Sequence, residues 1–193
     1  MHFVDVHGFN VRDGGDNTIN QNIPFILDAG HTVDKDEGAY GYFNLFMVSL
    51  TRSKQRQRVL FRLAEAFKKA DVIWTHSNGQ NFANQALDML PAKYNNTKIV
   101  IATSPAANRN TPIPQAVKAQ LVMYTPCDMA VRLATYIPFS RWGRMGAFGY
   151  NGDDNRNTNY KDKSIRGHSA WWRSENIEKT WNIGYNFAKE HII

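Results

Sequence analysis

One short apolar run lies between two helical patterns near the middle of the chain. Residues 71–75 read D-V-I-W-T, a length and composition typical of a buried strand. Residues 53–70 before them and residues 82–90 after them place apolar side chains at helical spacing. A buried strand between two helices favours a parallel sheet that is covered by helices on both faces.

The rest of the chain continues this alternation. Further strands are expected at residues 2–6, 29–33, 98–102, 119–124 and 145–150. A terminal helix is expected over residues 174–189, and the polar residues 151–159 suit a hairpin or an exposed loop. The predicted fold class is therefore α/β, a three-layer α/β/α sandwich with a mostly parallel central sheet of about five or six strands. At 193 residues, we expect one domain spanning residues 1–193.

The chain is basic, with a formal net charge of +6. Much of the excess lies in residues 53–69 and 141–166. The first cluster is typical of the solvated face of a helix, although such a face also supports loose binding to an anionic partner such as nucleic acid. No recognised nucleic-acid module accompanies the charge, so this signal is unspecific.

Three features of the sequence bear on cellular location: the number of cysteines, the N-terminal residues and the length of the apolar runs. Cys127 is the single cysteine, which excludes an internal disulfide and fits a reducing compartment. No basic and apolar leader opens the sequence, and no run reaches the length of a membrane span. The expectation is a cytoplasmic protein, and nothing in the residues sets an oligomeric state.

Polar clusters follow or adjoin the predicted strands. They are H-G-F-N at residues 7–10, T-H-S-N-G at 75–79, T-P-C-D at 125–128 and G-H-S at 167–169. Ligands of parallel sheets bind at the carboxyl ends of the strands, so these clusters are expected to converge there. In chain order they supply a serine, an acid and a histidine, namely Ser77, Asp128 and His168.

The run of strand, T-H-S-N-G and helix resembles the nucleophile elbow of the α/β-hydrolase superfamily, in a small esterase- or lipase-like form. The likeness covers most of the chain by layout and rests specifically on three short motifs. Gly79 matches the family pattern G-x-S-x-G, whereas Thr75 stands where the pattern has glycine. Because the H-G pair already occurs at residues 7–8, the resemblance implies a truncated fold that lacks the usual first hairpin.

The resemblance implies a role for each of five residues. Ser77 would be the nucleophile, His168 the general base, and Asp128 the acid that orients the histidine. The oxyanion would be held by the backbone N–H groups of Phe9 and Asn78, with Asn10 as the second choice for the first donor. No cofactor is implied, and the histidines lack the spacing of a zinc site.

Each assignment has an alternative. Ser77 and Asp128 are also ordinary helix caps, the latter for a helix over residues 129–134. Asp153 or Asp154 could replace Asp128 if the polar segment folds back over the site. The other candidate histidines are His2, His31, His76 and His191, and the His76 side chain is expected to point away from the position of the base.

These residues support two hypotheses from different classes. The first is a serine hydrolase that cleaves an ester, thioester or amide of a small-molecule or lipid-like acyl substrate, with a carboxylic ester favoured by the resemblance. A lid would come from residues 104–115 or 129–143, and apolar side chains of an acyl pocket from Tyr136, Ile137, Phe139 and Trp142. The second is a catalytically inactive module of the same fold whose basic surface binds an anionic partner such as nucleic acid.

Overall fold

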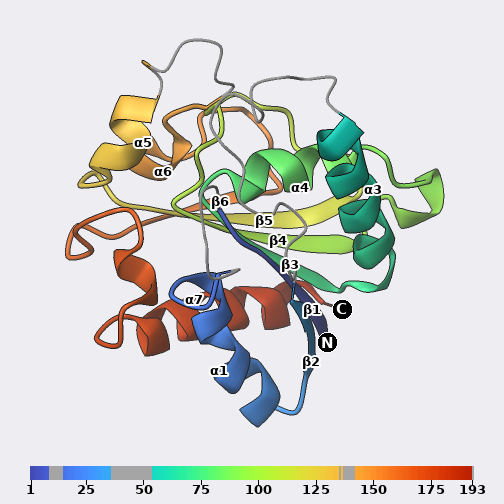
Figure 1. Cartoon of the computed structure of the whole chain (residues 1–193), viewed down its shortest axis with the longest axis horizontal. Coiled ribbons are helices and arrows are strands. Elements are labelled where there is room, and N and C mark those ends of the chain that lie inside the picture. Colours follow the sequence, from blue (N-terminus) through green and yellow to red (C-terminus); the bar gives the residue numbers. More distant parts are fainter. Residues whose placement is uncertain (9–14, 36–53, 135, 137–141, 193) are drawn as a thin grey trace.

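The structure is a computed structural model of the chain, and it describes residues 1–8, 15–35, 54–134, 136 and 142–192. Six strands form one open, all-parallel sheet in the order β2-β1-β3-β4-β5-β6 (Figure 1). The strands are β1 His2–Val6, β2 Thr32–Lys35, β3 Val72–His76, β4 Lys98–Thr103, β5 Val117–Tyr124 and β6 Asn157–Lys161. This sheet confirms the predicted fold class, and the parallel order requires a crossover between each pair of strands.

Helices cover both faces of the sheet, as Figure 1 shows. They are η1 Ile19–Asn22, α1 Ile23–Asp28, α3 Lys54–Lys69, α4 Gly79–Leu87, η2 Ala92–Tyr94, α5 Met129–Ala134, α6 Met145–Phe148, η3 Ala170–Trp172 and α7 Ile177–His191. None of the helices that the described residues form has the length and apolar content needed to cross a bilayer.

Alternation along the strands divides the core into two layers. Val4 and Ile73 pack with side chains of α3 and α4 on one face of the sheet. Phe3 and Trp74 pack with α1 and α7 on the other. Since successive side chains of a strand point to opposite faces, one run of apolar residues supplies both layers. Trp74 stacks on Trp181 of α7 with 5.9 Å between the ring centroids, which fixes the terminal helix against the sheet centre.

The strand expected at residues 145–150 is wrong. Residues Met145–Phe148 form the short helix α6, because the N–H groups of Met145 and Gly146 bind carbonyls of the 105–107 loop rather than a neighbouring strand. The sixth strand lies further on, at Asn157–Lys161, within the segment expected to be a loop or hairpin. It is an edge strand that pairs only with β5, and its side chains are half-buried or exposed, so it shows no apolar pattern.

Candidate active site

Ser77 lies in the sharp turn that joins β3 to α4. Its backbone has a φ of 56°, in the left-handed region that non-glycine residues rarely adopt. The Ser77 N–H donates to the Thr103 carbonyl at 3.2 Å, and the Ser77 carbonyl accepts from the Ala106 N–H at 3.0 Å. The end of β4 and the loop after it therefore hold the strained residue in place.

Two glycines allow the end of β1 to approach this turn closely. A Cβ atom on Gly8 would lie 2.8 Å from the Ser77 Cβ and 3.3 Å from its Oγ. A Cβ atom on Gly79 would lie 2.6 Å from the Val6 carbonyl oxygen and 2.7 Å from that of His7. The H-G pair at residues 7–8 is thus in contact with the serine, and any larger side chain at either glycine would push the two segments apart.

Thr75, which stands where the family pattern has glycine, is accommodated below the turn. Its side chain is fully buried, and its hydroxyl donates to Gln80 Oε1 at 2.6 Å. Gln80 Nε2 in turn donates to Asn84 Oδ1 at 2.7 Å. The hydroxyl of Thr75 is therefore bound within α4, and Ser77 keeps its left-handed conformation above it.

Asp128 and His168 are joined directly. Asp128 Oδ2 lies 2.8 Å from His168 Nδ1, although forty residues separate the two in sequence. Asp128 Oδ1 accepts from the Val131 N–H at 3.0 Å, so the same fully buried carboxyl also caps α5. The Thr125 hydroxyl donates to the Ile165 carbonyl at 2.6 Å and ties the two turns together.

This hydrogen bond assigns the protons of His168. A carboxylate oxygen only accepts, so Nδ1 must carry the proton in the pair. In the neutral ring, Nε2 is then left with its lone pair, which is the arrangement that a general base requires. Because 22% of the His168 side chain is exposed, a substrate can reach it, whereas the Asp128 side chain is 0% exposed.

His76 contacts His168, so the expectation that its side chain points away from the base is wrong. The two ring centroids are 4.8 Å apart, and His76 Nε2 donates to the His168 carbonyl at 3.3 Å. The Trp172 ring also lies against His76, nearly perpendicular to it, with 5.9 Å between the ring centroids. Burial lowers the pKa of His76 well below its ordinary value, and the nearby charges of His168 and His7 lower it further. A neutral His76 thus connects β3, one residue before Ser77, to the loop of His168.

Of the two expected oxyanion donors, Asn78 lies within the described residues. Asn78 is buried at the start of α4, and within the described residues its backbone N–H donates no hydrogen bond. That N–H group also lies at a helix N-terminus, which favours negative charge. Phe9 and its alternative Asn10 lie outside the described residues.

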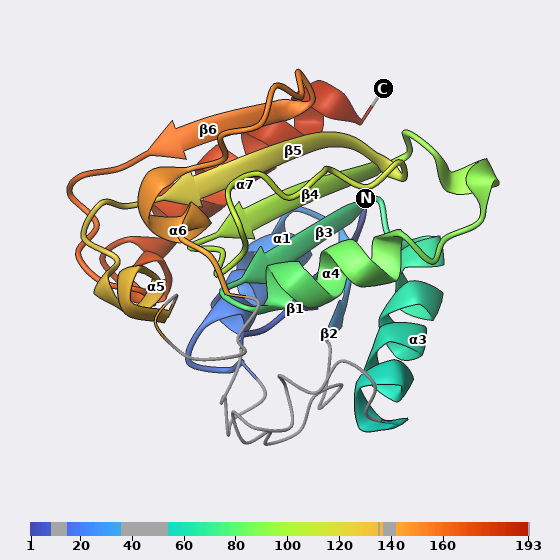
Figure 2. The same cartoon turned by 90° about the horizontal axis from the view of Figure 1, so that it is seen from above.

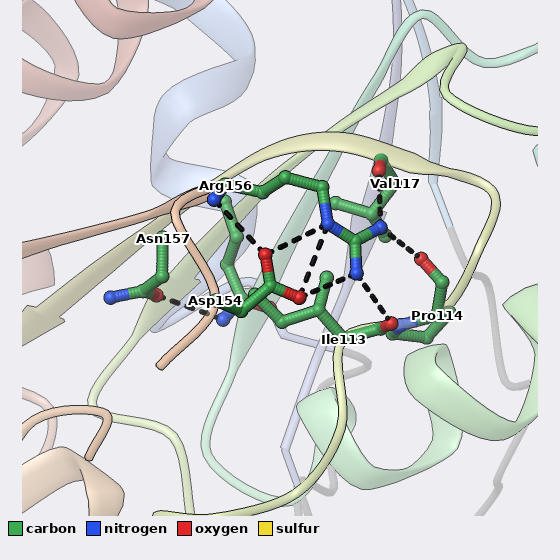
Figure 3. A network of polar contacts seen from close by, with 7 residues as sticks. Ile113, Pro114, Val117, Asp154, Arg156 and Asn157 are labelled. Carbon is green, nitrogen blue, oxygen red and sulfur yellow. Dashed lines mark hydrogen bonds and ion pairs between the residues drawn. The ribbon is translucent and has the colours of Figure 1, made fainter. Parts of the chain in front are cut away.

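The alternative acids lie at the other end of the sheet. Asp154 forms an ion pair with Arg156 at 2.6 Å, close to the start of β6 (Figure 3). The hydrogen bonds from Arg156 hold the pKa of Asp154 below its ordinary value. Asp153 and Asp154 line a shallow depression of about 560 Å³ there. The alternative that either residue pairs with His168 is therefore wrong, because Asp128 occupies that position.

The remaining candidate histidines bind elsewhere. His2 contacts Thr32 and Asp34, His31 contacts Tyr185, and His191 contacts the Phe187 carbonyl. Among the described residues, no group of three or more His, Cys, Asp or Glu side chains has the arrangement of a metal site. Cys127 is an exposed free thiol.

A buried polar pair that was not predicted from the sequence is formed by Asp5 of β1 and Asn22 of η1. Asp5 and Asn22 are almost completely buried, and neither side chain has a well-formed hydrogen bond among the described residues. Burial raises the pKa of Asp5 well above its usual range, and the nearby Asn22 amide offsets this only in part. His76 Nδ1 is likewise buried without a partner in the described part of the chain. A strand covered on both faces is expected to be apolar throughout, so the acidic residue in H-F-V-D-V is itself a signal in the sequence.

No family model matches the chain, and no curated protein matches it in sequence. Solved structures do resemble it. A putative hydrolase of the α/β superfamily from Xanthomonas campestris pv. campestris is 16% identical, with a TM-score of 0.54, and the match covers 98% of each chain. An α/β hydrolase enzyme from a sediment metagenome of the Mar Chica lagoon is 15% identical, with a TM-score of 0.63 and coverage of 100% of this chain and 92% of that one.

A monoacylglycerol lipase from Paleococcus ferrophilus is 12% identical, with a TM-score of 0.57, and the match covers 97% of this chain and 94% of the lipase. At such identities the likeness concerns the fold, and these matches extend over nearly the full length of each partner. The parallel sheet and the near-complete coverage of these structures agree with the resemblance seen in the sequence. The chain has the α/β-hydrolase fold.

Proposed function

We propose that the protein is a serine hydrolase that cleaves an ester, or a related thioester or amide, through an acyl-enzyme. One observation carries the proposal: His168 is bound to Asp128 at 2.8 Å and also contacts His76, the last residue of the strand that precedes the left-handed Ser77. This supplies a nucleophile, a base and an orienting acid at the carboxyl end of one sheet.

The proposed reaction begins when Ser77 Oγ attacks the substrate carbonyl carbon and His168 Nε2 takes the serine proton. The carbonyl oxygen then carries the negative charge, which the Asn78 N–H at the start of α4 stabilises. The intermediate collapses, and His168 returns its proton to the leaving group. Water repeats the sequence on the acyl-enzyme and frees Ser77. Asp128 holds the imidazole in the required tautomer throughout.

The distance between nucleophile and base must shorten during this reaction. Among the described residues, the Ser77 hydroxyl makes no hydrogen bond to His168. Such contacts are often long in free enzymes and tighten when substrate binds. The substrate proposed is a small-molecule or lipid-like acyl compound, with a carboxylic ester first, a choice supported by the monoacylglycerol lipase among the proteins of the same fold.

The test is covalent labelling of the purified chain with a fluorophosphonate, followed by mapping of the modified peptide. Ser77 should be labelled, and Ser77→Ala should remove the adduct. Ser104 is a matched control, because it also has a positive φ, of 46°, at the end of a parallel strand. Its Oγ accepts a hydrogen bond from the Trp171 indole at 3.0 Å, so Ser104→Ala should leave labelling of Ser77 intact.

Labelling that persists in Ser77→Ala, or a protein that is inert to both the probe and p-nitrophenyl esters, would overturn the proposal. The rival would then be the catalytically inactive module with a basic surface. Salt-dependent binding of a polyanion by an inert but folded chain is the result expected of that rival.

A further inference from the structure

Large apolar side chains are exposed together at one place on the molecule. Of the exposed large hydrophobic residues in the described chain, Met129, Leu133 and Tyr136 lie on α5 or just after it, and Phe148 lies on α6. Their exposed fractions are 55%, 58%, 73% and 40%. We call these four residues and the arginines beside them the α5–α6 surface. The concentration is notable because single exposed apolar residues are ordinary, whereas a group of them marks an interaction site.

The arginines of this surface lie over its aromatic rings. The Arg132 guanidinium is 4.9 Å from the centroid of the Phe148 ring, and that of Arg109 is 5.7 Å from the same centroid. The Arg144 guanidinium is 5.6 Å from the Tyr136 ring. Stacking of this kind holds the cations beside the apolar side chains, so charge and apolar area form one surface.

The chain around this surface contains almost no negative charge. Residues 125–152, which include both helices, carry three arginines and a single acidic residue, Asp128. The Asp128 side chain is fully buried and bound to His168. Since the one carboxylate of residues 125–152 is buried and bound to His168, the net charge of this segment is positive and complements an anionic partner.

The exposed side chains cannot be removed from water by turning inward. The inner side of α5 is already packed, because Val131 lies against Ala106 and Ala147 in a small buried cluster. The N–H of Gly143 donates to the Ala106 carbonyl at 3.0 Å, and that of Gly146 donates to the Pro105 carbonyl at 2.7 Å. Met129 and Leu133 are four residues apart on one helix face, directed away from this cluster.

The surface also adjoins the candidate active site. Helix α5 begins at the residue after Asp128, the partner of His168. Figure 2 shows α5 and α6 at the end of the sheet to which the arrows of β4, β5 and β6 point. Helix α3, which carries the other basic cluster, lies on the opposite side of the molecule in both Figure 1 and Figure 2.

We propose that the α5–α6 surface docks the protein on an anionic lipid surface. Burial of aliphatic side chains among the lipid acyl chains is favourable, because it removes apolar area from water. Aromatic rings and arginines are typical of the headgroup region, and positive charge is attracted to anionic headgroups. Nucleic acid would use the arginines and rings but offers little to Met129 and Leu133, so the aliphatic pair favours lipid. Docking does not depend on the hydrolase reaction.

The experiment uses the full chain carrying Ser77→Ala, so that hydrolysis cannot alter the lipid. Flotation is measured with phosphatidylcholine vesicles and with vesicles that also contain about 30% phosphatidylglycerol. We expect binding to the anionic vesicles, weakened about tenfold by Met129→Gln with Leu133→Gln, and about fivefold by Arg132→Gln. Thermal melting verifies that each variant is folded.

The matched controls lie on α3, where Phe61 is 60% exposed and Arg58 and Arg62 are exposed beside it. Phe61→Gln and Arg58→Gln should leave vesicle binding unchanged. The proposal is overturned by absence of binding to anionic vesicles, by equal losses in the α3 and α5 variants, or by a preference for single-stranded oligonucleotide over vesicles. If the chain still floats with anionic vesicles but the unaltered protein, which has Ser77, is not labelled by fluorophosphonate, only the hydrolase proposal is refuted.

Discussion

Arg156 and His76 lie at opposite ends of the sheet. The side-chain donors of Arg156 are all hydrogen-bonded, whereas polar atoms near His76 lack partners in the described chain. At the amino end, Arg156 donates to the Asp154 carboxylate and to three backbone carbonyls, those of Ile113, Pro114 and Val117 (Figure 3). These bonds use its Nε and both terminal nitrogens, so its donors are satisfied.

At the carboxyl end, polar groups are left with unused hydrogen-bonding capacity. His76 Nδ1 and both oxygens of Asp5 are buried without partners in the described chain, and Ser77 keeps a strained backbone. A satisfied network stabilises one arrangement, whereas unpaired groups and strain cost stability and persist where a site requires them. The network at the amino end therefore stabilises the fold, whereas the strain and unpaired groups at the carboxyl end are typical of functional sites.

Asp128→Asn should give the largest effect that separates these two ends. Asparagine retains an oxygen that can cap α5, but its amide can present an N–H to His168 and so favour the wrong tautomer. We expect kcat for an ester substrate to fall on the order of 10⁴-fold, with little change in stability. Asp128→Ala should additionally lose about 1 kcal/mol of unfolding free energy with the cap. Unaltered kcat in Asp128→Asn would remove the acid from the mechanism.

Arg156→Ala should show the reverse pattern. Removing the guanidinium leaves the Asp154 carboxylate and three carbonyls without their donor, so the unfolding free energy should fall by about 2–4 kcal/mol. Hydrolytic kcat should stay within about twofold, because the network lies at the end of the sheet away from Ser77. Urea unfolding and ester hydrolysis measured on the same preparation test both statements. A large loss of kcat in a folded variant would contradict the division between the ends.

Asp5→Asn tests the cost of unused polarity at the carboxyl end. Since burial raises the pKa of Asp5 in the folded state, its contribution to stability is present at low pH and is lost as pH rises through the folded pKa. The variant should be more stable than the parent at neutral pH, on the order of 1 kcal/mol. Its stability should also lack this decline with rising pH. Melting temperatures measured from pH 4 upward test this expectation. A variant that is no more stable than the parent at neutral pH would contradict it.

Lys179→Met should have the smallest effect and tests a satisfied pair at the carboxyl end. Burial raises the pKa of Asp162, but hydrogen bonds from Lys179 and Ser164 outweigh it and lower the pKa to about 2. The stabilisation is therefore present above the unfolded pKa and is lost as pH falls through about 2. Half of the Lys179 side chain is exposed, so we expect a loss below about 1 kcal/mol at neutral pH. Acid titration of stability should show a smaller drop in the variant than in the parent.

The local sequence pattern was sufficient to predict the strands and helices that bury a continuous apolar face. These elements are β1, β3, β4, α3 and α4. Their apolar residues form short continuous runs in the strands and recur at helical spacing in the helices. Ser77 follows β3, Asp128 follows β5 and His168 follows β6, and all three strands are parallel. Their joint position at one edge is a consequence of that topology.

The remaining features depend on contacts between residues distant in sequence. Strand β6 is defined by pairing with β5 alone, and α6 forms because the 105–107 loop provides acceptors for its first N–H groups. The sequence favours Asp128 because it follows a predicted strand, but both Asp128 and Asp154 have the local pattern of a turn or cap. Only the fold brings one of them to His168 and the other to Arg156.

The sequence by itself thus determined the α/β class and the carboxyl edge at which polar residues gather, because strand alternation and helix periodicity are properties of neighbouring residues. The packed fold was needed to choose between Asp128 and its alternatives, to direct His76 toward His168, and to leave apolar side chains of α5 exposed. Those outcomes are set by the packing of segments that are remote along the chain, and a pairwise contact across forty residues leaves no periodic trace in the sequence.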